Sequence, residues 1–387
     1  ALILLLTVFC VWETSRLKIG DPTPGSPVFY DNHPYNQDQA VINKSFDASS
    51  ENFVLYYEGA AGSVYEPVVL NTFESFSRHM AERLPDIYKS STSILNIVSI
   101  LNRTFHDGDM LWEQLPLEKE MLTGILGYIR NTVDRGTLGR FMDATLERAQ
   151  ITLYFADHTS DNLLRIRNAA YDFFRNHPMK IGGGQFLLAG GRIGMEIAVN
   201  EEMKRSHLLI DLAVYLAILV LCSLCYRSIV AGLMLTVPLI LANSMAATYM
   251  SIRDIGLSIN TLPIAAIGAG LGVDFAIYLY SRIMEEFPIQ NGNWTTTIMQ
   301  SVCTCGKAVV YTGVTVILPI LTWYLLSDMK FQAEVGFFLS IIMAANVVLA
   351  LTLHPLMIYI IKPKFISRNL ETETAKAPSA SLGLLQE

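Results

Sequence analysis

An aspartate lies inside one of the long apolar runs of this chain. Asp274 stands in the stretch Gly268-Ala-Gly-Leu-Gly-Val-Asp-Phe-Ala-Ile-Tyr278, eight residues before Arg282. At a rise of about 1.5 Å per residue, its carboxyl group would lie roughly 12 Å from the end of a spanning helix. An ionised carboxylate is costly there, so we expect it to be protonated for part of the time or paired. Reversible protonation would suit a proton-coupled machine; the alternative is a structural carboxyl group hydrogen-bonded across helices.

Three glycines surround this aspartate. Gly270 precedes Asp274 by four residues, which places both on one face of a helix, and Gly268 and Gly272 flank that position. Small residues let a neighbouring helix approach the backbone closely. Such glycines are common in membrane helices, but beside a single buried acid they indicate helix packing at a relay site.

Hydroxyl and amide groups on later apolar runs are candidate partners of Asp274. Tyr311, Thr312 and Thr315 share one side of the next run, and Asn346 stands near the middle of the last one. These groups can relay a proton or hydrogen-bond a carboxyl group. Each of them singly is more typical of a helix-packing hydrogen bond. Together they complete our predicted proton relay.

The elements that carry these residues are predicted to be membrane helices. The chain has 387 residues, of which 51% are hydrophobic and 16% charged, and its mean hydropathy is +0.36. This composition is too apolar for an ordinary soluble protein and makes the lipid bilayer a partner. The formal charge of −7, without a Lys/Arg-rich tract, argues against nucleic acid as a partner. Within residues 207–362 we expect five spanning helices, at about 208–226, 229–250, 259–281, 308–327 and 335–361.

The distribution of basic residues predicts the orientation of these helices. One set of links and the C-terminal tail carry six basic residues, Arg227, Arg282, Lys307, Lys362, Lys364 and Arg368, against Arg253 and Lys330 in the other links. The positive-inside bias places the richer set in the cytoplasm. The segment Met284–Gly306 is then expected to lie on the cytoplasmic leaflet, and residues 363–387 to form a disordered cytoplasmic tail.

The polar region 13–206 is predicted to be an α/β domain on the far side of the membrane. Its strand and helix patterns follow one another as strand 52–57, helix 69–84, strand 93–101 (or a helix), helix 117–133, strand 151–155, helix 163–173, strand 185–189 and helix 193–205. Two strand-helix-strand units suggest a pair of small α/β sandwiches. Residues 1–12 are too short to span, so we interpret them as the end of a truncated transmembrane helix and the chain as a fragment.

No catalytic constellation is found in the polar region. His79, His106, His158 and His177 are scattered without ligand spacing, and no Ser or Cys stands beside a recognisable base. We therefore expect no metal, no cofactor and no enzymatic activity. Intramembrane aspartyl proteases need two acids and a Gly-x-Gly-Asp signature, whereas the glycines before Asp274 stand one residue too far away.

Three stretches of the sequence resemble a known transporter family. They are Gly20–Pro27, Leu262–Glu286 and Gly306–Thr315. With the order of elements, they resemble the C-terminal half of resistance-nodulation-division (RND) transporters, and most of all the MMPL-type predicted exporters, relatives of the sterol-sensing-domain proteins. The resemblance covers nearly the whole chain.

The resemblance implies a fold, a location and an activity. The fold is a polytopic α-helical membrane bundle with an inserted α/β (ferredoxin-like) extracytoplasmic porter domain, in the bacterial inner membrane. Such proteins are duplicated, with twelve helices and two periplasmic porter domains, and use proton entry to export hydrophobic or lipidic molecules. The implied partners are that substrate and a missing N-terminal half, with a homo-oligomer or periplasmic accessory proteins left open.

By the same resemblance, Asp274 matches the coupling acid of the family. Members often have Tyr directly after that acid, where this chain has Phe275. Either another group, such as Tyr311 or Thr312, completes the relay, or this half is structural and the missing half carries the working acid. Two alternatives stay open: a sterol- or lipid-sensing module without transport, and a proton-driven accessory subunit of protein secretion.

Overall fold

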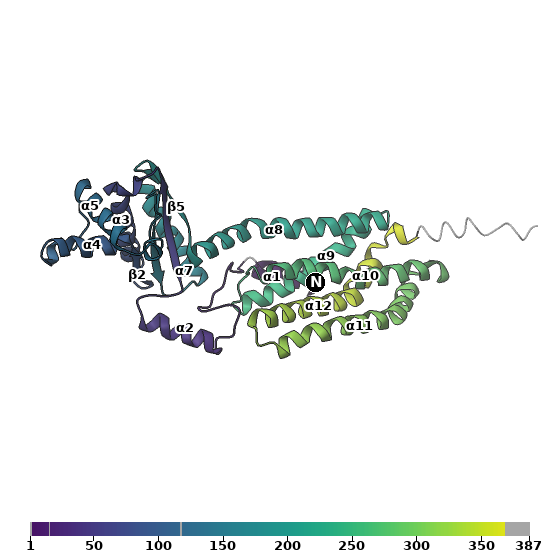
Figure 1. The fold of residues 1–387 in the computed structure, drawn as a ribbon. Helices are drawn as coiled ribbons and strands as arrows, with labels where there is room; N and C mark the ends of the chain where they lie inside the picture. The colour runs from purple at the N-terminus through teal and green to yellow at the C-terminus, as the bar shows by residue number, and fades with distance from the viewer. Residues whose placement is uncertain (1, 15, 117, 368–387) are drawn as a thin grey trace, which may run out of the picture. The chain divides into compact units, whose positions relative to one another are not determined.

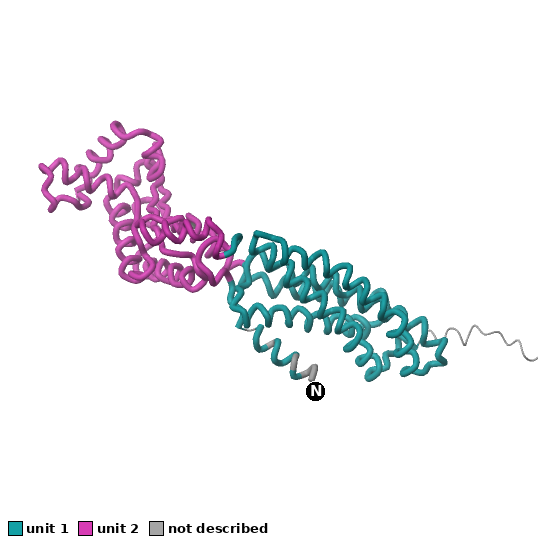
Figure 2. The backbone as a smooth tube through the Cα atoms, turned by 90° about the horizontal axis from the view of Figure 1, so that it is seen from below, with its two compact units in different colours: residues 1–19, 28–30, 203–387 teal, residues 20–27, 31–202 magenta. Residues whose placement is uncertain are grey.

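The computed structural model describes residues 2–14, 16–116 and 118–367, and they divide into two compact units (Figures 1 and 2). Described residues within 1–19, 28–30 and 203–387 form the helical unit, and those within 20–27 and 31–202 form the α/β unit. Each unit is described by itself below. Residues 368–387, most of the expected tail, lie outside the described residues.

The α/β unit is built on one five-stranded antiparallel sheet. Its strands are β1 (Asn52–Gly59), β2 (Tyr88–Ser93), β3 (Arg148–Phe155), β4 (Lys180–Ile181) and β5 (Gly184–Gly190). They lie side by side in the order β2-β3-β1-β5-β4, and every neighbouring pair is antiparallel. Buried residues alternate along β1 and β3, so one face of the sheet meets the core.

Two helices, α3 (Pro67–Arg83) and α7 (Ser160–Asn176), connect the strands of this sheet. The chain runs β1-α3-β2-β3-α7-β5, and β3 inserts between β1 and β2. This is the split β-α-β arrangement of a ferredoxin-like sandwich. The expected pair of sandwiches is therefore wrong, because the two strand-helix-strand units interleave into a single sheet.

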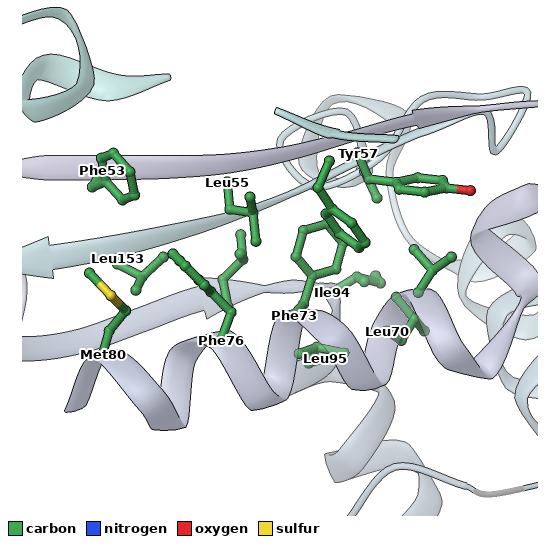
Figure 3. Packing of buried hydrophobic residues seen from close by; sticks show 14 of the residues in the cluster. Phe53, Leu55, Tyr57, Leu70, Phe73, Phe76, Met80, Ile94, Leu95 and Leu153 are labelled. Carbon is green, nitrogen blue, oxygen red and sulfur yellow. The ribbon is translucent and has the colours of Figure 1, made fainter. Parts of the chain in front are cut away.

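The core of the α/β unit lies between the sheet and α3 (Figure 3). Phe73 and Phe76 project from α3 toward Leu55 and Leu153 on the strands, and all four are buried. The rings of Phe76 and Phe173 meet edge to face at 5.2 Å, which ties α3 to α7. Burying each large apolar side chain contributes about 1.5–3 kcal/mol, so these contacts hold the layers together.

A helical insertion separates β2 from β3 and overturns one expectation. Its helices are α4 (Ile94–Phe105), α5 (Lys119–Thr132) and α6 (Arg135–Leu138), and a further helix, α2 (Pro34–Ser45), precedes β1. Residues 93–101, expected to be a strand or else a helix, lie mostly in α4, so the strand interpretation is wrong and the helical alternative is confirmed. Ser93 starts this helix with a capping box: its Oγ accepts from the Leu95 N–H at 3.2 Å, and the Asn96 side chain accepts from the Ser93 N–H at 2.9 Å. This cap outweighs the strand preference of the β-branched residues.

The described residues include five helices long and apolar enough to cross a membrane; four lie in the helical unit, and the fifth, α8, begins in the α/β unit and continues into the helical unit. They are α8 (Gly191–Cys225), α9 (Ile229–Ile252), α10 (Leu262–Ile289), α11 (Trp294–Leu326) and α12 (Lys330–Ile361), and a shorter helix, α1 (Leu2–Thr14), packs against α9. The helix expected at 193–205 is the beginning of α8. The long spans agree with a polytopic membrane bundle.

The segment Met284–Gly306 is not a separate interfacial element. Its first residues continue α10 and its last residues begin α11. Charged pairs one turn apart extend α10, because Arg282 contacts both Glu285 and Glu286. Asn293 then caps α11 by accepting from the N–H groups of Thr295 and Thr296. The tail also starts later than expected, since Phe365 is buried against Tyr226 at a ring distance of 5.7 Å.

Candidate proton-relay site

Helix α10 places Asp274 on an exposed face of the helical unit. Exposed residues recur along this helix at spacings of three and four, at Ile267, Gly270, Leu271, Asp274 and Tyr278. This spacing is that of a single helical stripe, and the stripe is apolar apart from the carboxyl group and the tyrosine hydroxyl. The aspartate therefore stands on a surface that this chain leaves uncovered.

This placement corrects the expectation that Asp274 is enclosed by its own bundle. In the part of the chain that the structure describes, no hydrogen bond or ion pair engages its carboxyl group. The reason lies in the helical turn: Asp274 follows Gly272 by two residues, about 200° around the helix. Because Gly272 faces α12, Asp274 faces away from it.

Two of the three predicted packing glycines make close contacts with α12. A Cβ atom on Gly272 would lie 2.0 Å from the Asn346 Nδ2, and one on Gly268 would lie 2.6 Å from the Ile342 Cγ2. Only glycine fits such a close approach without a shift of the neighbour. Gly270 is different, because a Cβ there would meet nothing within 4 Å. It lies on the open stripe, one turn before Asp274.

The side chain of Asn346 is buried at this glycine contact and is only 3% exposed. Its Nδ2 donates to the Gly268 carbonyl at 3.4 Å, from the middle of α12 to α10. The structure thus brings Asn346 together with Gly268 and Gly272. It does not bring Asn346 to Asp274, so in this chain the amide acts as a helix-packing group.

The three predicted hydroxyl partners lie on exposed parts of α11. Tyr311 is 74% exposed, and Thr312 and Thr315 are also exposed. The Thr315 hydroxyl donates to the Tyr311 carbonyl of its own helix. Among the described residues, no contact joins any of the three to Asp274. These residues are therefore available to a surface outside this chain, as Asp274 is.

A buried polar pair inside the helical unit was not foreseen as a contact. The His354 Nδ1 lies 3.2 Å from the Tyr280 hydroxyl, and the two rings meet nearly perpendicularly. Both side chains are almost fully buried. His354 precedes Pro355 inside α12, a position where the sequence suggests a kink first. Nothing in the sequence links residues so far apart, so only the packing of α10 on α12 reveals the pair.

The α/β unit contains a second unforeseen group, a buried cluster of charged side chains. Glu51 and His158 are 1% and 2% exposed, and the His158 Nδ1 lies 2.9 Å from the Glu51 Oε2. Arg192, in the first turn of α8, reaches the Glu51 Oε1 at 3.0 Å and the His158 Nε2 at 3.3 Å. From the sequence, His158 is only one of four histidines without ligand spacing, because Glu51, His158 and Arg192 are far apart in it.

Opposing effects set the protonation of this cluster. Burial disfavours the charge of Glu51, but the contact with His158 and the charges of His158 and Arg192 outweigh it and hold the pKa of Glu51 below its ordinary value. Burial likewise disfavours an imidazolium, but Glu51 and Glu196 together outweigh it and raise the pKa of His158 above its ordinary value. The cluster therefore favours a charged pair at mildly acidic pH.

Metal ligation finds no support in the described ranges. Residues 2–14, 16–116 and 118–367 hold no group of three or more His, Cys, Asp or Glu side chains placed to bind an ion.

Comparisons with known proteins indicate that this chain is similar to membrane proteins. The model of the MMPL family matches residues 189–374, just under half of the chain. This range contains all five long apolar helices, α8 to α12, and only the end of β5 from the sheet. The chain is also 27% identical over 181 residues to a protein of Methanocaldococcus jannaschii named "Putative membrane protein MJ1562". That alignment covers 46% of this chain and 45% of the relative, so the chain matches less than half of the relative's length. The resemblance drawn from the sequence is confirmed over the membrane helices.

Proposed function

We propose, from the MMPL match over residues 189–374, that this chain is one half of a proton-driven exporter of hydrophobic or lipidic molecules. The observation that carries the proposal is the position of Asp274 on the open stripe of α10. An acid in the apolar part of a membrane helix is rare and costly, and such acids typically serve ion or substrate pathways. Proton exchange at Asp274 would then bias the arrangement of the helices.

The open stripe supports a partner surface opposite α10. A carboxylate facing hydrocarbon would be costly, whereas one facing a second protein surface can be paired or hydrated. Gly270, with free space at its Cβ position, allows another helix to come close to the acid. The short match to the M. jannaschii protein leaves room for a further half of the transporter in a longer chain. That half is our proposed cover of Asp274.

The energy of proton entry is adequate for such a machine. One charge moving through about 100 mV gains about 2.3 kcal/mol, so one or two protons can bias a conformational step of a few kcal/mol. The ferredoxin-like unit, proposed to lie on the extracytoplasmic side, would use that step to pass apolar cargo. The inner membrane is the proposed location.

The substitution Asp274→Asn tests the coupling. In the complete protein, reconstituted into vesicles with a pH-sensitive dye inside and a fluorescent phospholipid as cargo, we expect Asn to abolish proton-driven cargo movement. Asp254→Asn is the matched control, because Asp254 is an exposed loop residue paired with Lys18 at 3.1 Å. Full proton-driven export by the Asp274→Asn variant would reject the proposal.

A lipid-sensing module is the second candidate, favoured by one observation. Phe275 supplies no hydroxyl beside Asp274, and no described residue completes a relay. A sensor would bind the fluorescent lipid without moving it under any pH gradient, and its binding would persist in Asp274→Asn. Gradient-dependent movement of the lipid would exclude this alternative.

A further inference from the structure

The buried cluster in the α/β unit joins four separate elements. Glu51 immediately precedes β1, His158 lies between β3 and α7, and Arg192 and Glu196 occupy the first turns of α8. From α2, the Gln39 Nε2 donates to the Glu51 Oε1 at 2.7 Å. Charged groups are rarely buried to this extent unless they are paired. The cluster thus connects the start of α8 to the sheet.

The backbone reinforces this joint. Gly191 begins α8 with φ +81°, and a Cβ atom there would lie 2.4 Å from the Asn52 carbonyl oxygen. The next N–H, that of Arg192, donates to the Asn52 Oδ1 at 2.7 Å. The first turn of α8 is therefore seated against the start of β1, and the guanidinium has little freedom in its position relative to Glu51.

The charges of the cluster balance only with an additional proton. Arg192 contacts two carboxylates, Glu51 at 3.0 Å and Glu196 at 3.1 Å. With a neutral His158 the four groups carry a net charge of −1, and with a protonated His158 they carry none. Burying an unbalanced charge is costly, so the folded unit gains from the proton.

The geometry shows where this proton would bind. The His158 Nδ1 lies 2.9 Å from the Glu51 Oε2, and the Nε2 lies 3.3 Å from the Arg192 NH2. In the protonated ring both nitrogens are donors, so Nδ1–H can pair with Glu51 while Nε2–H lies beside the guanidinium. The attraction of Glu51 and Glu196 outweighs the repulsion from Arg192 and raises the pKa of His158. Arg192 contacts both carboxylates, so the proton brings the whole cluster to charge balance.

We infer that Glu51, His158, Arg192 and Glu196 form a proton-responsive joint that fastens the first turn of α8 to the sheet more firmly when His158 is protonated. Helix α8 continues from this joint into an apolar span (Figure 1). The joint is separate from Asp274, and its two titrating groups, Glu51 and His158, lie outside the candidate spanning helices. The joint itself is inferred from the structure alone. Its proposed role in the cell, a response to an acidic outer compartment, rests on the proposed function.

Hydrogen exchange of the full chain in nanodiscs tests this inference. After correction for the intrinsic effect of pH, the amides of residues 191–196 should exchange more slowly as the pH falls, with a midpoint above 6.5, the ordinary pKa of histidine. The raised pKa of His158 sets the direction of the effect, so we expect the protection of these amides to increase as the pH falls. Unchanged exchange in the wild type, or a midpoint at or below 6.5, would overturn the inference.

Variants identify the groups responsible. His158→Gln and Glu51→Gln should flatten the pH dependence, whereas His177→Gln should keep it, because His177 caps the far end of α7 and contacts the Phe173 carbonyl there. Because His158→Gln is buried and can fail to fold, Glu196→Gln provides a milder test. It balances the cluster without a proton, so the midpoint should move to lower pH. An unmoved midpoint, or a dependence that survives in a folded His158→Gln, contradicts the joint.

The test is independent of transport. Asp274→Asn should leave the pH dependence of residues 191–196 intact, because Asp274 belongs to the other unit. Loss of export with an intact joint, or a failed joint with intact export, would therefore reject one proposal and leave the other standing.

Discussion

The two acidic sites of this protein differ in burial and in the partners of the carboxyl group. Glu51 is almost completely buried but has His158, Arg192 and Gln39 within contact distance. Asp274 is exposed and has no such partners among the described residues. The first site is therefore completed by its own chain, whereas for the second we propose a covering surface from outside this chain. Burial alone does not identify a functional acid; the supply of partners also matters.

The buried pair predicts a pH dependence of stability. The pKa of His158 is raised, so its contribution is present below pH 6.5 and is lost as the pH rises through the folded-state pKa. The pKa of Glu51 is lowered, so its contribution is present above pH 4.5 and is lost as the pH falls through the folded-state pKa. These two groups together favour maximal stability of the α/β unit between pH 4.5 and 6.5.

Thermal unfolding of the full chain in detergent measures this dependence. The measurements run from about pH 4 to about pH 8, a range that covers the titration of Glu and His side chains. In His158→Gln the loss of stability toward pH 8 should disappear, and in His106→Gln it should remain, since His106 stacks on Trp112 away from the cluster. A wild-type protein more stable at pH 8 than at pH 6 would contradict the assignment.

The contact between α10 and α12 depends on the alternation of glycines along one helix. Gly268 and Gly272 admit Ile342 and Asn346, while Gly270 faces open space. A membrane helix pair gains from such close packing because lipid provides no hydrophobic driving force between helices. The same alternation turns Asp274 away from α12. Helix packing and exposure of the acid are thus two results of one sequence pattern.

A pair of alanine substitutions tests this pattern. Gly272→Ala forces a Cβ atom against the Asn346 amide and should destabilise the helical unit by about 1–3 kcal/mol, the usual cost of overpacking. Gly270→Ala meets nothing within 4 Å and should change stability by less than about 0.5 kcal/mol. Denaturation of both variants in detergent compares them directly. Equal losses of stability would show that α10 and α12 are not packed as described.

The sequence predicts the elements of this chain better than their contacts. Apolar runs and alternating strand patterns locate the five long helices and strands such as β1, β3 and β5 because these signals are local. The single sheet was missed because the insertion of β3 between β1 and β2 depends on long-range pairing. The strand expected after Ser93 failed because a cap decided the local structure.

The candidate site shows the same limit. Residue type and depth single out Asp274, and small residues single out Gly268 and Gly272, without any coordinates. Which way each side chain points depends on the position of α12, and that position follows from packing. The cluster of Glu51, His158 and Arg192 has no sequence signal at all, because its members lie at the ends of elements that only the fold brings together.

The chain combines an apolar helical unit with an α/β unit whose two ends both continue into helical-unit residues. A chain that leaves the membrane before residue 20 and returns through α8 places the intervening region on one side. The turn between α10 and α11 is then on the opposite side, because α8, α9 and α10 make three crossings. Parity thus sets the α/β unit and the turn between α10 and α11 on opposite sides; the proposal that the α/β unit is extracytoplasmic comes from the positive-inside bias.

Labelling of introduced cysteines tests that topology. In a background whose five cysteines are replaced, Glu113→Cys in the α/β unit should react with a membrane-impermeant maleimide added to intact cells. Asn291→Cys, in the turn between α10 and α11, should react only after the cells are opened. Labelling of both positions in intact cells would reject the predicted orientation.

The interleaved sheet has a consequence for how the polypeptide is made. The middle strand, β1, finds its neighbours β3 and β5 only after about a hundred further residues have been synthesised, and contacts so distant in sequence are slow to form. Residue 190, the end of β5, is followed at once by α8, the next membrane-crossing segment. Translation therefore supplies the last strand of the sheet and the return to the bilayer almost simultaneously. A ribosome pause shortly after α8 would give a nascent domain the time to close.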